Sequence, residues 1–187
     1  MKLDPEAIMQ TQNSIQTETK FQWSMRSSLM NWLVEVHDQF SLLPETLFLA
    51  ANYIDRFFAV MVTPSEHLKL VGTTAMIIAA KFINITPHTS IQYVGKKLGY
   101  TIEDIVAVER VMLNCLAFNL DWPDPISFLR RLCTTNSCRV TENLAMYLIE
   151  ATLVDENFVG LLPSLLAASA FYLAKVTKKH GQWVSCC

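Results

Sequence analysis

Residues 25–37 read Met-Arg-Ser-Ser-Leu-Met-Asn-Trp-Leu-Val-Glu-Val-His, and this stretch decides the fold. Its large apolar residues recur at intervals of three and four residues, at Met25, Leu29, Trp32, Leu33, Val36 and Phe40. This spacing places them on one face of an α-helix and predicts a helix over about residues 23–40. Arg26 lies near the start of that helix, where a cation turned toward a core needs an anionic partner.

Further helices follow along the chain, and each begins at a sequence that favours a helix start. The expected starts are Pro44, the capping sequence Thr63-Pro64-Ser65-Glu66, Pro87 and Thr101. The helix after Thr63 is apolar nearly all round, which is typical of a helix surrounded by others. The pattern therefore predicts five helices between about residues 23 and 120, preceded by a polar tail over residues 1–22.

A second helical region follows a clear interruption. The sequence Asp121-Trp122-Pro123-Asp124-Pro125 breaks helical structure and predicts a domain boundary. Three more helical runs come after it, at about 126–134, 141–155 and 163–178, and Ala174-Lys175 in the last run echoes Ala80-Lys81. We expect residues 121–187 to be an incomplete copy of the first domain, whose last helix has an exposed apolar face.

Composition limits the class of protein. Hydrophobic residues make up 51% of the 187 residues and charged residues 17%, which indicates a folded core. The net charge of −2 lacks the basic excess that nucleic-acid binding needs. Residues 157–174 carry no charge, but Gly160 and Pro163 interrupt them, so no membrane span is expected. An odd count of five cysteines favours a reducing, intracellular compartment.

Motifs of catalytic chemistry are missing from the sequence. It has no glycine-rich phosphate loop, no cluster of metal ligands and no Gly-x-Ser-x-Gly sequence, and its four histidines are scattered. The sequence therefore favours a protein that is not an enzyme and needs no cofactor or metal.

Four charged residues interrupt apolar helical segments: Arg26, Asp55, Lys81 and Glu109. Moving a charged side chain out of water costs about several kcal/mol of free energy unless the charge is paired. Two cations and two anions suggest two ion pairs, Arg26 with Asp55 and Lys81 with Glu109. Alternatively, Lys81 complements a helix dipole, and the two acidic side chains face water.

These charges and their flanking sequences closely resemble a cyclin box, the helical module that binds and switches on cyclin-dependent protein kinases. Cyclin boxes carry an arginine in the first helix, an aspartate in the second, a leucine and a lysine in the third and a glutamate in the fifth. The matching residues are Arg26, Asp55, Leu70, Lys81 and Glu109. The resemblance covers about residues 21–178 and is closest to B-type, mitotic cyclins of fungal character.

The resemblance implies an all-α cyclin fold, in which a five-helix cyclin box precedes a partial second box. It implies a regulatory subunit that activates a cyclin-dependent serine/threonine kinase, recruits its substrates and controls mitotic progression in nucleus and cytoplasm. By that resemblance Lys81 and Glu109 meet the kinase near its mobile C-helix. Phe82 would be an apolar anchor beside them, although its alternative interpretation is a core phenylalanine.

The resemblance also implies a docking patch for Arg-x-Leu motifs of substrates or inhibitors. Its residues would be Met25, Leu29, Trp32, Glu35, Leu68 and Lys69. From spacing alone, Met25, Leu29 and Trp32 could simply be core. Ser28 replaces the branched apolar residue usual in the family and Lys69 replaces a neutral amide, so we expect weaker docking than in a typical mitotic cyclin.

Two other functions are compatible with the sequence. Ile83-Asn84 stands where many mitotic cyclins carry two acidic residues, which suits a scaffold that binds a kinase without activating it. The cyclin fold of transcription initiation grips DNA, but it needs basic surfaces and often a zinc ribbon, which this sequence does not show.

Overall fold

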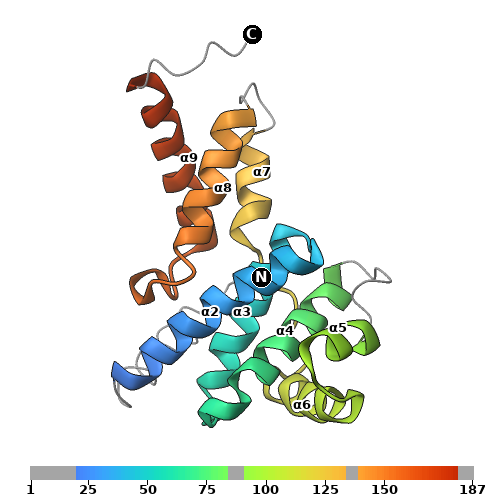
Figure 1. Cartoon of the computed structure of the whole chain (residues 1–187). Coiled ribbons are helices and arrows are strands. Elements are labelled where there is room, and N and C mark those ends of the chain that lie inside the picture. Colours follow the sequence, from blue (N-terminus) through green and yellow to red (C-terminus); the bar gives the residue numbers. More distant parts are fainter. Residues whose placement is uncertain (1–19, 84–90, 134–138, 181–187) are drawn as a thin grey trace. The chain divides into compact units, whose positions relative to one another are not determined.

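The computed structural model describes residues 20–83, 91–133 and 139–180, and every regular element in these ranges is helical (Figure 1). This confirms the all-α prediction. The chain divides into two units between Trp122 and Pro123. The first unit contains α2 (Lys20–Phe40), α3 (Pro44–Phe58), η1 (Ser65–His67), α4 (Leu68–Ile83), α5 (Ile91–Leu98) and α6 (Ile102–Cys115). The second unit contains α7 (Pro125–Cys133), α8 (Arg139–Ala151), η3 (Glu156–Phe158) and α9 (Pro163–His180).

Some predictions lie outside the described residues. Most of the predicted polar tail falls there, and α2 begins at Lys20, three residues before the predicted start. The predicted start at Pro87 and the departure at Asn84 also fall outside, and α5 is described from Ile91.

Helix α4 is the central element of the first unit. It contacts α2, α3, α5, α6 and η1, and all ten residues from Val71 to Ala80 are buried. Its small and β-branched residues let neighbouring helices approach from several sides. The prediction of a helix surrounded by others is therefore confirmed.

Helices α2 and α4 come close together at Gly72. A Cβ atom on Gly72 would lie 3.0 Å from Leu29 Cδ1 and 3.2 Å from Trp32 Cζ3, so a side chain there would push both away. The inner face of α2 continues into the core through Leu33 and Val36, which are 0% and 3% exposed. Their predicted core positions are confirmed.

Three of the predicted helix starts are present. Pro44 lies in the first turn of α3, and α9 begins at Pro163. Thr101 caps α6, because its Oγ1 accepts a hydrogen bond from the backbone N–H of Asp104 at 3.1 Å.

The predicted cap at Thr63 is wrong. Pro64 precedes the short 3₁₀ helix η1, has extended backbone angles (φ −59°, ψ 146°) and makes no side-chain cap, and α4 begins only at Leu68. The extended conformation of Pro64 rules it out as the first residue of the α-helix.

In the second unit, α9 packs against α7 and α8 through Ala167, Ala170 and Ala174. Its opposite face exposes Leu165, Tyr172 and Leu173, each more than half accessible to solvent. Helix α4 has neighbours on several sides, whereas the described part of the second unit covers α9 on one side only. The apolar face that was expected on α9 is therefore exposed.

Candidate kinase-binding and docking surfaces

Lys81 and Glu109 form an ion pair between two helices of the first unit. Lys81 lies in the last turn of α4, and its Nζ donates to Glu109 Oε1 of α6 at 2.6 Å. The side chains are 39% and 16% exposed, so the pair lies at the surface. A side chain this accessible can change partners when another molecule binds, because an exposed ion pair stabilises a fold by only about 0–1 kcal/mol.

Phe82 lies beside this pair and is 49% exposed. Its alternative interpretation as a core phenylalanine is therefore wrong. A half-exposed aromatic ring next to a surface ion pair offers apolar area that a partner can bury. The structure thus pairs Lys81 with Glu109 and leaves Phe82, the next residue of α4, half exposed, and these are the residues that the resemblance assigns to kinase binding.

Arg26 and Asp55 form the second ion pair, and it is buried. Arg26 Nε and Nη2 donate to the two carboxylate oxygens of Asp55 at 2.7 and 2.9 Å, and the side chains are only 6% and 14% exposed. The Arg26 guanidinium also lies 5.9 Å from the centroid of the Trp23 ring. This bidentate pair joins α2 to α3, which is a structural role.

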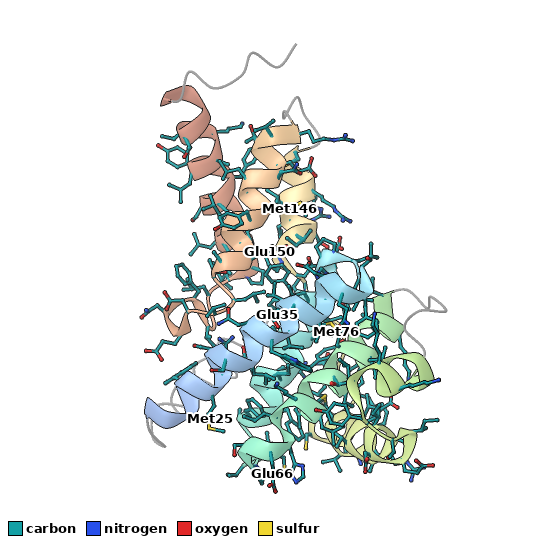
Figure 2. All side chains as sticks on the ribbon, in the orientation of Figure 1. Met25, Glu35, Glu66, Met76, Met146 and Glu150 are labelled. Atoms are coloured by element: carbon teal, nitrogen blue, oxygen red, sulfur yellow. The ribbon has the colours of Figure 1, made fainter. Side chains whose placement is uncertain are left out.

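The residues of the predicted docking patch come from α2 and from the start of α4. Met25 and Trp32 are partly buried and Glu35 is exposed, and Figure 2 labels Met25 and Glu35 along α2. Leu68 and Lys69 are the first two residues of α4, which contacts α2. The Nζ of Lys69 lies 5.5 Å from the centroid of the Trp32 ring. The structure therefore joins the two parts of the patch at Trp32.

Leu29 does not belong to the accessible patch. Its side chain is 3% exposed and lies against Gly72, between α2 and α4. The prediction that Leu29 lines the patch is corrected to a core role, because the close approach of the two helices covers it. Trp32 has both roles, since it packs on the core cluster around Val36 and Ile77 and remains partly exposed.

A polar clamp that no sequence pattern predicted joins α3 to the segment after α6. The Tyr53 hydroxyl donates to the carbonyl of Leu120 at 2.8 Å. The Arg56 guanidinium donates to the carbonyls of Asn119 and Leu116 at 2.8 and 3.3 Å. The three carbonyls belong to the segment that follows α6, and the two side chains fix this segment to α3.

The clamp coincides with an unusual turn that presents Phe118 to solvent. Ala117 and Phe118 both have positive φ angles, 49° and 57°, and Phe118 is 66% exposed. Residues with a Cβ atom adopt this left-handed conformation only when the surroundings impose it. The sequence could not reveal this turn, because no glycine marks it. Only the polar Tyr53 and Arg56 within an apolar helix could have indicated the clamp.

Burial of Tyr53 gives a testable pH dependence. Burial raises the pKa of its hydroxyl above the ordinary value of 10.0, and nearby Arg56 opposes this only in part. Above pH ~10 the unfolded chain loses this proton while the folded chain retains it, so stability falls as pH rises. We expect Tyr53→Phe to lack this loss, which amounts to about 1.4 kcal/mol per pH unit above pH ~10. Urea unfolding of the unaltered protein and of Tyr53→Phe at neutral and alkaline pH measures this loss of stability. If the stabilities of the two proteins changed with pH in parallel, the expectation would be contradicted.

The described part of the chain also bears on metal binding and on membrane insertion. No three His, Cys, Asp or Glu side chains gather there in a way that could hold a metal ion. None of its helices is both long enough and apolar enough to cross a membrane.

Two helical units, the first with a small-residue helix at its centre, define a class of all-α proteins with two helical domains. Family models identify the class further: the "Cyclin, N-terminal domain" model matches residues 1–121 and the "Cyclin, C-terminal domain" model matches residues 123–187. The chain belongs to the cyclin family.

Curated relatives support this membership. The chain is 41% identical to G2/mitotic-specific cyclin-3 of Saccharomyces cerevisiae over 169 residues, which cover 89% of this chain and 39% of the relative. It is 40% identical to G2/mitotic-specific cyclin cig1 of Schizosaccharomyces pombe over 176 residues, which cover 93% of this chain and 42% of the relative. The chain thus spans about two fifths of the length of these relatives.

Solved structures share the fold. A viral cyclin from herpesvirus saimiri matches with a TM-score of 0.77 and 18% identity, over 85% of this chain and 72% of that one. A chain of the yeast TFIIK (Kin28/Ccl1/Tfb3) complex matches with a TM-score of 0.69 and 13% identity, over 95% of this chain and 86% of that one. At these identities the comparison supports the fold alone.

Proposed function

We propose that this protein is a regulatory subunit that binds and activates a cyclin-dependent serine/threonine protein kinase and controls mitotic progression. The observation that carries the proposal is the surface formed by Lys81, Phe82 and Glu109, at the positions that the cyclin resemblance assigns to kinase binding. The names of the curated relatives, which are G2/mitotic-specific cyclins, support the mitotic assignment.

Activation would work by a population shift in the kinase. A free kinase holds its C-helix outward, so the lysine–glutamate ion pair of its active site is not assembled. A partner that binds only the inward form raises the population of that form. Moving the ratio from about 1:99 to 99:1 takes roughly 5.5 kcal/mol of differential binding.

The Lys81–Glu109 pair cannot supply this free energy alone, because an exposed ion pair contributes about 0–1 kcal/mol. An apolar interface of about 1,600 Å² in total can supply it. Phe82 offers apolar area beside the pair. Phe118, which follows the helix that carries Glu109, is a second exposed aromatic side chain available for such an interface.

The patch of Met25, Trp32, Glu35, Leu68 and Lys69 would recruit substrates or inhibitors of the kinase in nucleus and cytoplasm. Its apolar centre is Trp32, which is held in place by the core yet partly exposed. Short extended motifs bind such surfaces through one or two anchoring side chains.

Co-elution with a monomeric cyclin-dependent kinase tests binding directly. We expect the two purified proteins to elute together from a size-exclusion column as a 1:1 complex. Separate elution at micromolar concentration would overturn the proposal. Co-elution without activation would instead indicate a scaffold that binds the kinase without activating it. Ile83 supports this alternative, because many mitotic cyclins have an acidic residue at that position.

A further inference from the structure

The exposed face of Trp32 is already occupied by a cation of the protein itself. Lys69 Nζ lies 5.5 Å from the centroid of the Trp32 ring, within the range of a cation–π contact. The Trp32 ring is fixed, since it packs on the core cluster and lies against Gly72 of α4. Lys69 is exposed and its long side chain is flexible. The contact therefore joins a rigid aromatic platform to a movable charge.

A positively charged ligand group meets two obstacles at this platform. It must displace the Lys69 ammonium from the ring, and it is then repelled by that ammonium, which remains nearby because its backbone belongs to α4. The arginine of an Arg-x-Leu motif is such a group. Glu35, one helical turn beyond Trp32 on α2, attracts an arginine, but it cannot remove the repulsion at the ring.

A ligand segment that carries a carboxylate next to an apolar anchoring side chain experiences the opposite effect. It pairs with the Lys69 ammonium without displacing it, while the apolar side chain packs on the Trp32 edge and Met25. Glu35 of α2 repels this carboxylate, so the ligand has one favoured direction, with its acidic residue toward α4. Glu66 precedes Lys69 by one turn, and its carboxylate lies 3.6 Å from His67 Nε2 and is 77% exposed. Like Glu35, it favours a ligand carboxylate placed at the Lys69 ammonium itself and not further along the chain.

We propose that Lys69 is a specificity-determining residue of the docking patch, which selects extended segments that carry an acidic residue next to an apolar anchor. This inference rests on the proposed function, because it names the chemistry of the segments that the same patch recruits. It extends the expectation of weak Arg-x-Leu docking to a change of preferred motif.

Three peptides of equal length test the proposal: one containing Arg-Ala-Leu, one Gln-Ala-Leu and one Glu-Ala-Leu at the same position. Fluorescence anisotropy measures their binding to the full chain and to Lys69→Gln. We expect the unaltered protein to bind the Glu peptide most tightly. In Lys69→Gln the affinity for the Arg peptide should rise about two- to fivefold, as expected from losing one exposed cation–π contact, and that for the Glu peptide should fall by a similar factor.

Lys97→Gln is the matched control, because Lys97 Nζ lies 4.9 Å from the centroid of the Phe40 ring, also on α2 but away from Trp32. It should leave all three affinities unchanged. Equal changes for the Arg and Glu peptides in Lys69→Gln, or no measurable binding of any peptide, would overturn the proposal. Co-elution of Lys69→Gln with the kinase is measured in parallel. Failure of the unaltered protein to co-elute contradicts the proposed function. Loss of the peptide preference in a protein that still co-elutes contradicts only this inference.

Discussion

Replacing Asp55 by alanine is expected to lower the free energy of unfolding by about 3–5 kcal/mol, the usual cost of removing one partner of a buried ion pair. The reason is Arg26, whose guanidinium is 6% exposed and loses both carboxylate contacts, at 2.7 and 2.9 Å. A loss of this size is a large part of the 5–15 kcal/mol by which domains are typically stable. Urea unfolding followed by circular dichroism measures it.

The matched control is Lys81→Ala, which breaks the exposed pair with Glu109. We expect it to cost less than about 1 kcal/mol, because Lys81 is 39% exposed and water reaches the pair, whereas Arg26 is 6% exposed. The double variant Arg26→Met with Asp55→Ala should recover part of the stability lost in Asp55→Ala, since it leaves no unpaired buried charge. A loss below about 1 kcal/mol in Asp55→Ala would show that the buried pair does not hold α2 to α3.

Phe82→Ala is expected to weaken kinase binding by about 30-fold or more, which corresponds to about 2 kcal/mol for an interface anchor. Its effect on the unfolding of the free protein should be small, because the ring is 49% exposed in the absence of a partner. Lys81→Glu should also weaken binding, since it places a second negative charge beside Glu109 and destroys the pair. Calorimetric titration with a cyclin-dependent kinase gives both affinities.

Tyr147→Ala on α8 is the control for Phe82→Ala, because Tyr147 is an exposed aromatic residue (65%) of the second unit. It should bind the kinase as the unaltered protein does. If Phe82→Ala binds within about twofold of the unaltered protein, Phe82 is no anchor. If Tyr147→Ala weakens binding as much as Phe82→Ala, the interface is not centred on the first unit.

Features that depend on burial alone could be predicted from the sequence. The apolar spacing of residues 25–37 was enough to place Leu33 and Val36 in the core, because helical periodicity assigns residues to a face. Four charges in apolar helices suggested two ion pairs, since buried charges require partners, and left open that Lys81 complements a helix dipole and the acidic side chains face water. Both pairs are formed in the structure.

Features that depend on how helices approach one another could not be predicted. Leu29 and Trp32 share a face of α2, yet Leu29 is covered and Trp32 is partly open, because Gly72 brings α4 closest to Leu29. Capping sequences were reliable at Thr101 and misleading at Thr63, where Pro64 stays extended. A short capping pattern does not contain the tertiary contacts that decide between these outcomes.

The most direct test is the rate at which a monomeric cyclin-dependent kinase phosphorylates histone when this protein is added to saturation. A shift of the kinase from about 1% to 99% active conformation predicts a rate increase of about 100-fold. At equal concentrations below saturation, Phe82→Ala should give a much smaller increase than Tyr147→Ala. An unchanged rate in a mixture whose components demonstrably co-elute would contradict the activating role and leave the protein a kinase-binding scaffold.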